Sequence, residues 1–523
     1  MGLWSAYFFA KLLLYAGGYI DFNPWLNLAF AAFTALPPKN GRQRFAKNLI
    51  AVPLSIVLLY HDSWLPPISR ALSQAGNLHS FTVGYSIELL GRFVSWQVLA
   101  ELALLLGAYS LVRRKLRLST FVFIAIVLTM LPHQWGAQTL GVVPAATAGS
   151  NAAPLQVDPR NMRPEALDAQ LAQFYAREKQ RQVRFAPVAQ DGAPYDIVIL
   201  NVCSLAWDDL RYVKRDRDPL FARFDLLLSN FSSGASYSGP AAIRLLRGNC
   251  GQTEHTQLYN PPNPECLVID GLQKAGFEPH WLMNHDGQFG NFYADVHDRG
   301  GMPVTPDSNN GALLAQQAFD GSPIYSDYSV LSRWWARRLQ NPAPRVVLYY
   351  NTVTLHDGNR VVGSGHTDSS YPTRLSQFIS DLARFLDDIQ HSGRHVIVVL
   401  LPEHGAALRG DRRQISGLRE IPTPAISHVP VGMMLLNAAK SQSVQQRIDT
   451  PTSFLAVNEL LSRLIADNPF AKPDVSVAGY MQGLPETDPV AENEGTTIIQ
   501  VGRQYMMRTP DGAWAPWDSV DER

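Results

Sequence analysis

This sequence has few cysteines and no net charge, and each of these properties excludes a class of protein. The 523 residues include only three cysteines, which is too few for a scaffold built on disulfides. The 45 basic and 45 acidic side chains cancel to a net charge of zero, so the basic stripe of a nucleic-acid binder is not expected. The length suggests two or three domains.

Acidic residues are also scarce near the N-terminus, and this reveals that the zero net charge is the sum of two unequal parts. Residues 1–136 contain four acidic and eleven basic side chains, whereas residues 137–523 contain 41 acidic and 34 basic ones. The charge-poor first part argues against a wholly soluble chain. We therefore expect a transmembrane domain of about five helices at 1–136, a linker with one helix at 137–194, and a folded domain at 195–523.

Five apolar stretches within residues 1–136 are long enough, or nearly so, to cross a lipid bilayer with a hydrocarbon core of about 30 Å. The expected spans are 3–20, 22–37, 47–65, 92–112 and 117–135. Lys11 and Glu101 interrupt these stretches. We expect Glu101 to face a neighbouring helix or a partner rather than lipid.

Basic residues between the expected spans predict the orientation of the chain. One cluster separates the second and third spans, and another separates the fourth and fifth: Lys39, Arg42, Arg44 and Lys47, then Arg113, Arg114, Lys115 and Arg117. Because basic loops stay in the cytoplasm, five spans place the chain after about residue 136 outside it. A rival interpretation is a signal-peptidase site at Ala146-Thr147-Ala148, which five preceding spans disfavour.

The rest of the chain predicts an α/β domain with a mostly parallel central sheet. Short apolar runs at 196–201, 345–350, 395–401 and 429–436 are typical of strands buried on both faces. Helical stretches lie at 164–182, 327–340, 373–390 and 452–465. Strands that alternate with helices favour a parallel sheet, and such sheets bind ligands at the carboxyl ends of their strands.

Side chains that bind metals follow three of these strands. Cys203 follows the first strand, His356 follows the second, and Glu403 and His404 follow the third. Thiolate, imidazole and carboxylate are the usual ligands of zinc. A single Cys or His at a strand end is more often structural, but three such positions together favour a metal site.

A candidate nucleophile lies in the small-residue segment 234–240, which precedes a helical stretch at 241–246. The first-turn amides and the dipole of a helix favour a phosphate at its N-terminus. Ser236 or Ser238 could therefore attack a phosphate, or either could simply cap the helix. The spacing alone does not distinguish these alternatives.

Five short motifs in the sequence resemble those of a known family. The motif sequences are Asn-Val-Cys-Ser-Leu at 201–205, Ser-Tyr-Ser-Gly-Pro-Ala at 236–241, Leu-Arg-Gly-Asn-Cys-Gly-Gln at 246–252, Asn-His-Asp-Gly-Gln-Phe-Gly-Asn at 284–291 and Leu-Pro-Glu-His-Gly-Ala-Ala at 401–407. The chain resembles the membrane-anchored phosphoethanolamine transferases of the alkaline-phosphatase superfamily, and specifically the BcsG type of cellulose synthase operons. The related lipid A enzymes usually have Glu, Thr and Asp where this chain has Cys203, Ser238 and Glu403.

The resemblance implies a reaction and a set of site residues. One Zn²⁺ ion would be held by Cys203, Ser238, Glu403 and His404. Ser238 would take phosphoethanolamine from phosphatidylethanolamine and pass it to glucose 6-hydroxyls of nascent cellulose. His356 would act as general acid and base, and the candidates for holding phosphate oxygens are Tyr237 and Arg419.

The resemblance also implies a location and partners. The chain would be a multi-pass protein of the bacterial inner membrane with a periplasmic catalytic domain, in contact with cellulose synthase subunits. The alternatives are a transferase that modifies lipid A or another glycan, a sulfatase-like hydrolase, and a non-catalytic scaffold of the synthase complex. A polar group formed by His285, Asp286 and His297 would line the pocket or complete a second metal site.

Cysteine pairing follows from the expected compartment. Cys250 and Cys266 are close in sequence, and an oxidising compartment favours a disulfide between them. Cys203 would then stay free as a metal ligand. The alternative is a disulfide between Cys203 and one of the other two.

Overall fold

We describe the fold from a computed structural model of the chain. The structure describes residues 2, 4–17, 19–63, 118–130, 162–188, 192–362, 370–440 and 444–517, together with a few positions between 82 and 111. Glu101, the basic cluster at 113–117, most of the expected span at 92–112 and the segment 146–148 lie outside the described residues. The chain divides into two units, the N-terminal helices and a larger unit with nearly all residues from Gln156 onward.

The N-terminal unit contains helices at four of the expected spans: α1 (Trp4–Ala16), α2 (Pro24–Ala35), α3 (Gly41–His61) and α7 (Leu118–Leu128). Their buried side chains form a small apolar core. Inside it, Lys11 Nζ lies 2.8 Å from Asp62 Oδ2 and donates a hydrogen bond to Asn27 Oδ1. Among the described residues, no helix combines the length and the apolar character that a membrane span requires. The membrane crossing therefore stays a prediction.

The larger unit is built on a seven-stranded sheet. Its strands are β1 (Asp196–Val202), β2 (Leu226–Ser232), β3 (Glu278–Met283), β6 (Val346–Thr352), β8 (Val396–Pro402), β9 (His428–Leu436) and β10 (Gln446–Ile448). Their order across the sheet is β10-β2-β9-β8-β1-β6-β3. Strand β1 is fully buried and lies between β8 and β6, parallel to both.

The sheet is mostly parallel, as expected, but it is mixed, because one strand runs in the opposite direction. Strand β9 runs antiparallel to both β8 and β2. A parallel return requires a crossover that usually includes a long helix. The connection from β8 to β9 contains only the four-residue helix α16 (Pro424–Ser427), so β9 returns beside β8 in the opposite direction.

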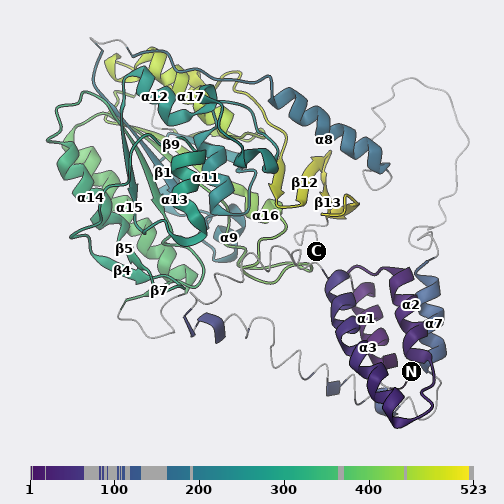
Figure 1. Cartoon of the computed structure of the whole chain (residues 1–523). Helices are drawn as coiled ribbons and strands as arrows, with labels where there is room; N and C mark the ends of the chain where they lie inside the picture. The colour runs from purple at the N-terminus through teal and green to yellow at the C-terminus, as the bar shows by residue number, and fades with distance from the viewer. Residues whose placement is uncertain are drawn as a thin grey trace, which may run out of the picture. The chain divides into compact units, whose positions relative to one another are not determined.

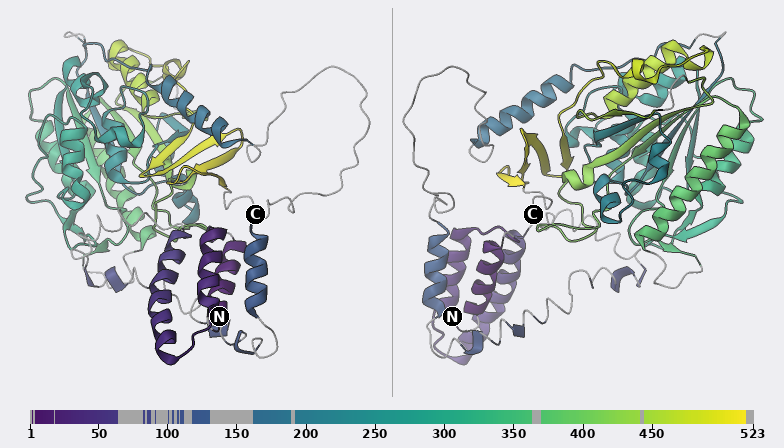
Figure 2. Two further views of the ribbon diagram at one scale, coloured as in Figure 1. Left: turned by 45° about the vertical axis from the view of Figure 1, so that its right-hand side comes forward. Right: turned by 180° about the vertical axis from the view of Figure 1, so that it is seen from behind.

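Helices cover both faces of this sheet, as Figures 1 and 2 show. One face packs against α11 (Ser238–Leu246), α12 (Val268–Ala275) and α17 (Phe454–Asp467). The other packs against α14 (Asp327–Arg338) and α15 (Tyr371–Ser392). Successive side chains of β1 alternate between these two cores, as the period of a strand requires.

Two smaller sheets were not anticipated from the sequence. A four-stranded antiparallel sheet contains β11 (Val490–Asn493), β12 (Thr496–Val501), β13 (Gln504–Arg508) and β14 (Trp514–Trp517). A three-stranded sheet contains β4 (Leu314–Gln317), β5 (Pro323–Tyr325) and β7 (Arg360–Val361). The helix expected within a linker, α8 (Pro164–Glu178), instead packs on the four-stranded sheet through Leu167, Leu171 and Phe174.

A buried ion cluster fixes the start of β1. Both carboxylate oxygens of Asp196 accept hydrogen bonds from Arg338, at 3.0 and 2.9 Å, and Arg394 binds the same carboxylate. The carboxylate also accepts the backbone N–H of Val346 at 2.9 Å. Asp196 therefore ties β1 to the first residue of β6, to α14 and to the loop before β8.

Substitution of Asp196 tests this cluster. Asp196→Ala should lower the free energy of unfolding by about 3–5 kcal/mol, because it leaves the fully buried Arg338 without its partner. Asp387→Ala is the matched control, since Asp387 pairs with Arg223 at 2.7 Å but is 54% exposed, and it should cost less than about 1 kcal/mol. Urea denaturation followed by circular dichroism gives both values. Equal losses would contradict the assigned role.

Candidate metal centre and active site

Three side chains of the expected metal site meet at the carboxyl ends of two adjacent strands. Cys203 directly follows β1, and Glu403 and His404 directly follow β8. The two strands are parallel, with Val202 opposite Pro402, so these three residues leave the sheet at the same edge. Their sulfur, oxygen and nitrogen atoms all lie within 4.8 Å of one another, and all three side chains are buried.

Ser238 joins this group from a different element. It is the first residue of α11, and its Oγ lies 3.4 Å from Cys203 Sγ and 3.2 Å from His404 Nε2. The helix has Tyr237 at its N-cap position and no side-chain capping bond, so neither Ser236 nor Ser238 caps it. A Cβ on the next residue, Gly239, would collide with the Asp295 carboxylate, which explains a glycine at this close approach.

His404 is oriented for metal binding by its own loop. Its Nδ1 lies 2.9 Å from the carbonyl oxygen of Gly405, so Nδ1 carries the proton and donates to that oxygen. The lone pair of Nε2 then faces Cys203, Glu403 and Ser238. Metal-binding histidines commonly donate their second ring nitrogen to a backbone carbonyl in this way.

Glu403 has one satisfied and one unsatisfied oxygen. Oε1 accepts a hydrogen bond of 2.6 Å from Asn351 Nδ2, which also donates to Asn201 Oδ1. Within the described residues, Oε2 has no hydrogen-bond partner although it is buried, and it lies 3.8 Å from His404 Nε2. A buried carboxylate oxygen without a protein donor, beside a thiol and an imidazole, is typical of a metal ligand.

Sequence reasoning did not give the two asparagines a role. Asn201 and Asn351 are the next-to-last residues of β1 and β6, and they are register partners across these adjacent strands. The Asn351 amide holds the Glu403 carboxylate and is itself positioned by Asn201 Oδ1, and His285 Nε2 lies 2.8 Å from Asn351 Oδ1. Their position in the sequence could have indicated this role, because both lie near the ends of strands, beside the expected ligands.

The electrostatics of the site suit a bound cation. Burial raises the pKa of the Cys203 thiol to about 12 and that of Glu403 to about 7, and it lowers the pKa of His404 well below its usual value. Desolvation thus disfavours the thiolate and carboxylate forms that bind a cation. A divalent cation reverses this preference. The sulfur, oxygen and nitrogen donors, with the Ser238 hydroxyl beside them, fit zinc.

A buried carboxylate shapes the loop that carries Glu403 and His404. Asp209 accepts the backbone N–H groups of Ala406 at 2.6 Å and Leu408 at 3.1 Å. A Cβ on Gly405 would approach Asp209 Oδ2 to 2.7 Å, so this position requires a glycine. Asp209, which the sequence did not single out, therefore fixes the turn that points His404 at the site.

His356 lies outside the metal cluster but within its electrostatic reach. It follows β6, is half-buried, and its Nδ1 lies 2.8 Å from the Asp357 carbonyl oxygen. Burial and the positive charge of Arg419 lower its pKa to about 4. The imidazole is therefore neutral near pH 7, with Nε2 able to accept a proton.

Arg419 and Tyr237 pack against each other beside the cluster. The Arg419 guanidinium is 7% exposed and lies 5.2 Å from the centre of the Tyr237 ring. Its Nη1 donates to Ser204 Oγ at 3.2 Å and lies 3.2 Å from His404 Nδ1. The Tyr237 hydroxyl donates to Glu420 Oε1 at 2.7 Å, so Glu420 positions the tyrosine.

The remaining polar group does not assemble into a metal cluster. Asp286 is exposed and accepts the N–H of Gln288, whereas His297 lies 2.8 Å from Asp298 and stacks on Tyr293. Among the described residues, the His, Cys, Asp and Glu side chains form a single cluster suited to a metal, at Cys203, Glu403 and His404.

The cysteines fall into two classes. A disulfide joins Cys250 and Cys266, which lie 16 residues apart in sequence. Cys203 is a free, buried thiol. Its sulfur is therefore available to the cluster.

Comparison with known proteins identifies the family. Residues 151–514 match the model of the cellulose biosynthesis protein BcsG C-terminal domain, and residues 4–131 match that of the N-terminal domain. The chain is 38% identical to the cellulose biosynthesis protein BcsG of Escherichia coli K12 and 36% identical to that of Salmonella typhimurium LT2. Both alignments cover 98% of this chain and 96% of the relative.

A solved structure is more distantly similar. A protein of the alkaline phosphatase superfamily from Vibrio parahaemolyticus is 12% identical, with a TM-score of 0.46, over 68% of this chain and 91% of the other. The two domain models and the nearly full-length relatives leave one conclusion: this chain belongs to the BcsG family of cellulose biosynthesis proteins.

Proposed function

We propose that this chain transfers phosphoethanolamine from phosphatidylethanolamine to glucose 6-hydroxyls of nascent cellulose, through a covalent intermediate on Ser238. The observation that carries the proposal is the position of Ser238 Oγ at the N-terminus of α11, 3.4 Å from Cys203 Sγ and 3.2 Å from His404 Nε2. A hydroxyl held beside a metal ligand set and first-turn amides is suited to attack a phosphorus atom.

In the first half of the reaction, Ser238 Oγ loses its proton and forms a bond to the phosphorus of the lipid. The phosphorus–oxygen bond to diacylglycerol breaks, and diacylglycerol leaves with a proton. One zinc ion, held by Cys203, Ser238, Glu403 and His404, would lower the pKa of the serine hydroxyl and offset the negative charge of the phosphoryl oxygens. The first-turn amides of α11 and the charge of Arg419 act on the same anion.

In the second half, a glucan hydroxyl attacks the phosphoserine ester and Ser238 is released. His356 takes the proton of that hydroxyl, because its Nε2 is unprotonated near pH 7. The same histidine serves as the acid of the first half only if the bound phosphate raises its pKa, as a nearby anion does. Tyr237, positioned by Glu420, borders the space beside Ser238.

We place the catalytic unit in the periplasm, tethered by the N-terminal helices to the inner membrane. The apolar stretches and the basic loops of residues 1–136 support this orientation. A tethered site would meet its lipid donor in the bilayer and its polymer acceptor outside the cytoplasm. Cellulose synthase subunits are the expected partners.

Removal of the nucleophile gives the first test. Ser238→Ala should abolish transfer and the mass increase of one phosphoethanolamine group, seen by intact-protein mass spectrometry after incubation with phosphatidylethanolamine. Ser236→Ala is the matched control, because Ser236 is a buried serine two residues away whose Oγ has no partner within the described residues. Labelling that persists without Ser238, or disappears without Ser236, would refute the assignment.

The metal content gives a second test. The purified full-length protein should hold about one zinc per chain, and Cys203→Ser should lose most of it, because a hydroxyl replaces the thiolate ligand. Elemental analysis measures both. His297→Gln should leave the content unchanged, since His297 contacts Asp298 and Tyr293 rather than the cluster. Two tightly held ions, or a loss in the His297 variant, would indicate a binuclear site instead.

His356 should separate the two halves of the reaction. With His356→Gln, we expect steady-state transfer to fall by about 10²–10⁴-fold, because the glucan hydroxyl lacks its base. Phosphoethanolamine should then accumulate on Ser238, which time-resolved intact-mass measurements detect. If the variant forms no intermediate at all, His356 acts in the first half. Unchanged transfer would remove it from the mechanism.

A further inference from the structure

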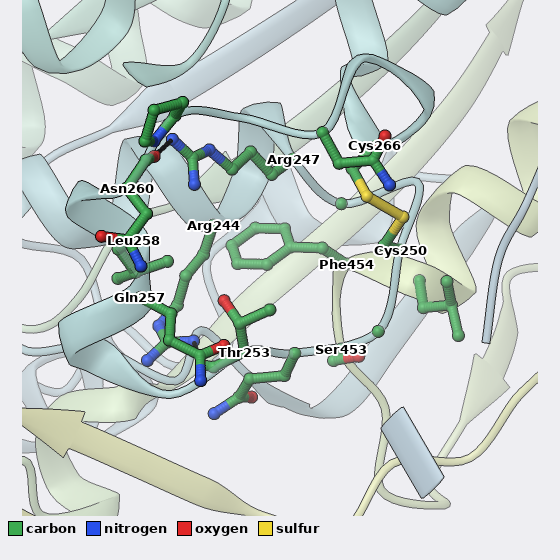
Figure 3. A pocket seen from close by; sticks show the side chains of 16 residues that line it. Arg244, Arg247, Cys250, Thr253, Gln257, Leu258, Asn260, Cys266, Ser453 and Phe454 are labelled. Carbon is green, nitrogen blue, oxygen red and sulfur yellow. Dashed lines mark hydrogen bonds between the residues drawn. A yellow bond between two sulfur atoms is a disulfide. The ribbon is translucent and has the colours of Figure 1, made fainter. Parts of the chain in front are cut away.

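A cavity of about 230 Å³ lies away from the nucleophile, at the other end of α11 (Figure 3). Its walls come from the end of α11, from the loop closed by the Cys250–Cys266 disulfide, and from the first turn of α17. Arg247 is nine residues beyond Ser238, roughly 13 Å along a helix axis. The motif at 246–252 lines this cavity, and the proposed reaction does not use it.

Two arginines line the cavity. Arg244 is 6% exposed; its Nη1 donates to the Thr253 carbonyl and its Nη2 pairs with Glu492, yet within the described residues its Nε has no partner. Arg247 donates to the carbonyl oxygens of Arg299 and Asn260. No salt bridge to Arg247 is present among the residues that the structure describes, whereas Arg299 pairs with Asp295.

The charge of Arg247 is poorly compensated. Its burial, together with the positive charge of Arg299, lowers its pKa. Arg247 is half-buried, and an anion in the cavity would offset the cost of a partly desolvated cation without a carboxylate partner. Backbone carbonyl oxygens accept the hydrogen bonds of Arg247, but they do not neutralise its positive charge.

The first turn of α17 adds to the positive potential. Phe454 and Leu455, the first two residues of this 14-residue helix, line the cavity, and the N-cap residue Ser453 forms no capping bond with its side chain. The first amides of a helix lack partners within it, and its dipole favours an anion there. The Nε of the buried Arg244, which has no partner within the described residues, is an independent sign that this wall can take an acceptor group.

We propose that this cavity binds a small phosphorylated ligand of the size of phosphoethanolamine, with its phosphoryl group between Arg247, Arg244 Nε and the first turn of α17. Two guanidinium groups and helix amides match the several oxygens of a phosphoryl group. The ring of Phe454, which lies among these groups in Figure 3, can face an ammonium group. The assignment to phosphoethanolamine rests on the proposed function, but the anion site does not.

Hydrogen exchange of the full-length, zinc-loaded protein tests this site, with inorganic phosphate and glycerophosphoethanolamine as probes. Both should protect peptides that cover 247–263 and the first turn of α17. Glycerophosphoethanolamine, a lipid headgroup without acyl chains, should reach half-protection at a concentration at least about threefold lower if the ammonium group is also bound. Equal half-protection by the two probes would overturn the phosphoethanolamine assignment, and the site would then take phosphate alone.

Variants tie the protection to the cavity. Arg247→Gln should remove it, and Arg337→Gln, at an exposed arginine paired with Asp307, should leave it unchanged. Gln257 is an exposed lining residue, so its substitution does not threaten folding. Gln257→Glu should raise the half-protecting concentration by about threefold to tenfold, and Gln257→Lys should lower it by a similar factor.

The same experiment distinguishes failure of the cavity site from failure of the proposed reaction. Peptides that contain Ser238 and His404 report ligand binding at the nucleophile in the same experiment. Protection confined to those peptides, or protection of 247–263 that ignores the charge at position 257, would overturn the cavity site. If transfer through Ser238 fails but the cavity peptides respond as described, the anion site stands and its link to phosphoethanolamine falls.

Discussion

The burial of Cys203, Glu403 and His404 in one cluster constrains the rest of the site. Burial disfavours the charged forms of the thiol and the carboxylate, so a cation would stabilise the ionised ligands that these strands bring together. Neighbouring groups are arranged to keep the cluster rigid around that charge. Asn351, which Asn201 positions, holds Glu403, and the Gly405 carbonyl fixes the proton of His404.

The sheet explains why residues distant in sequence converge. Parallel pairing of β1 with β6 and β8 brings the residues after all three strands to one edge. The long connection from β8 to β9 carries Glu403, His404 and Arg419 instead of a crossover helix. The same connection therefore supplies these site residues and returns the chain antiparallel to β8 as β9.

Parts of this arrangement could be read from the sequence. The apolar runs located β1, β6, β8 and β9, and the residues after three of them included the metal cluster, because strand ends meet at an edge. The direction of β9 relative to β8 could not be predicted, because an apolar run is equally compatible with a parallel and an antiparallel strand. Asn351 and Asp209 were missed because their roles depend on hydrogen bonds across 52 and 197 residues. The packing of α8 on the C-terminal sheet was missed because its surroundings have the composition of a linker.

Solid-state NMR of the extracellular polymer tests most directly whether the Ser238 site modifies cellulose. Polymer from cells that carry the native chain should show phosphoethanolamine attached at the glucose 6-position. Polymer from cells with Ser238→Ala should be made but should lack that substituent. Equal modification in both polymers, or an unmodified polymer from the native cells, would contradict the account.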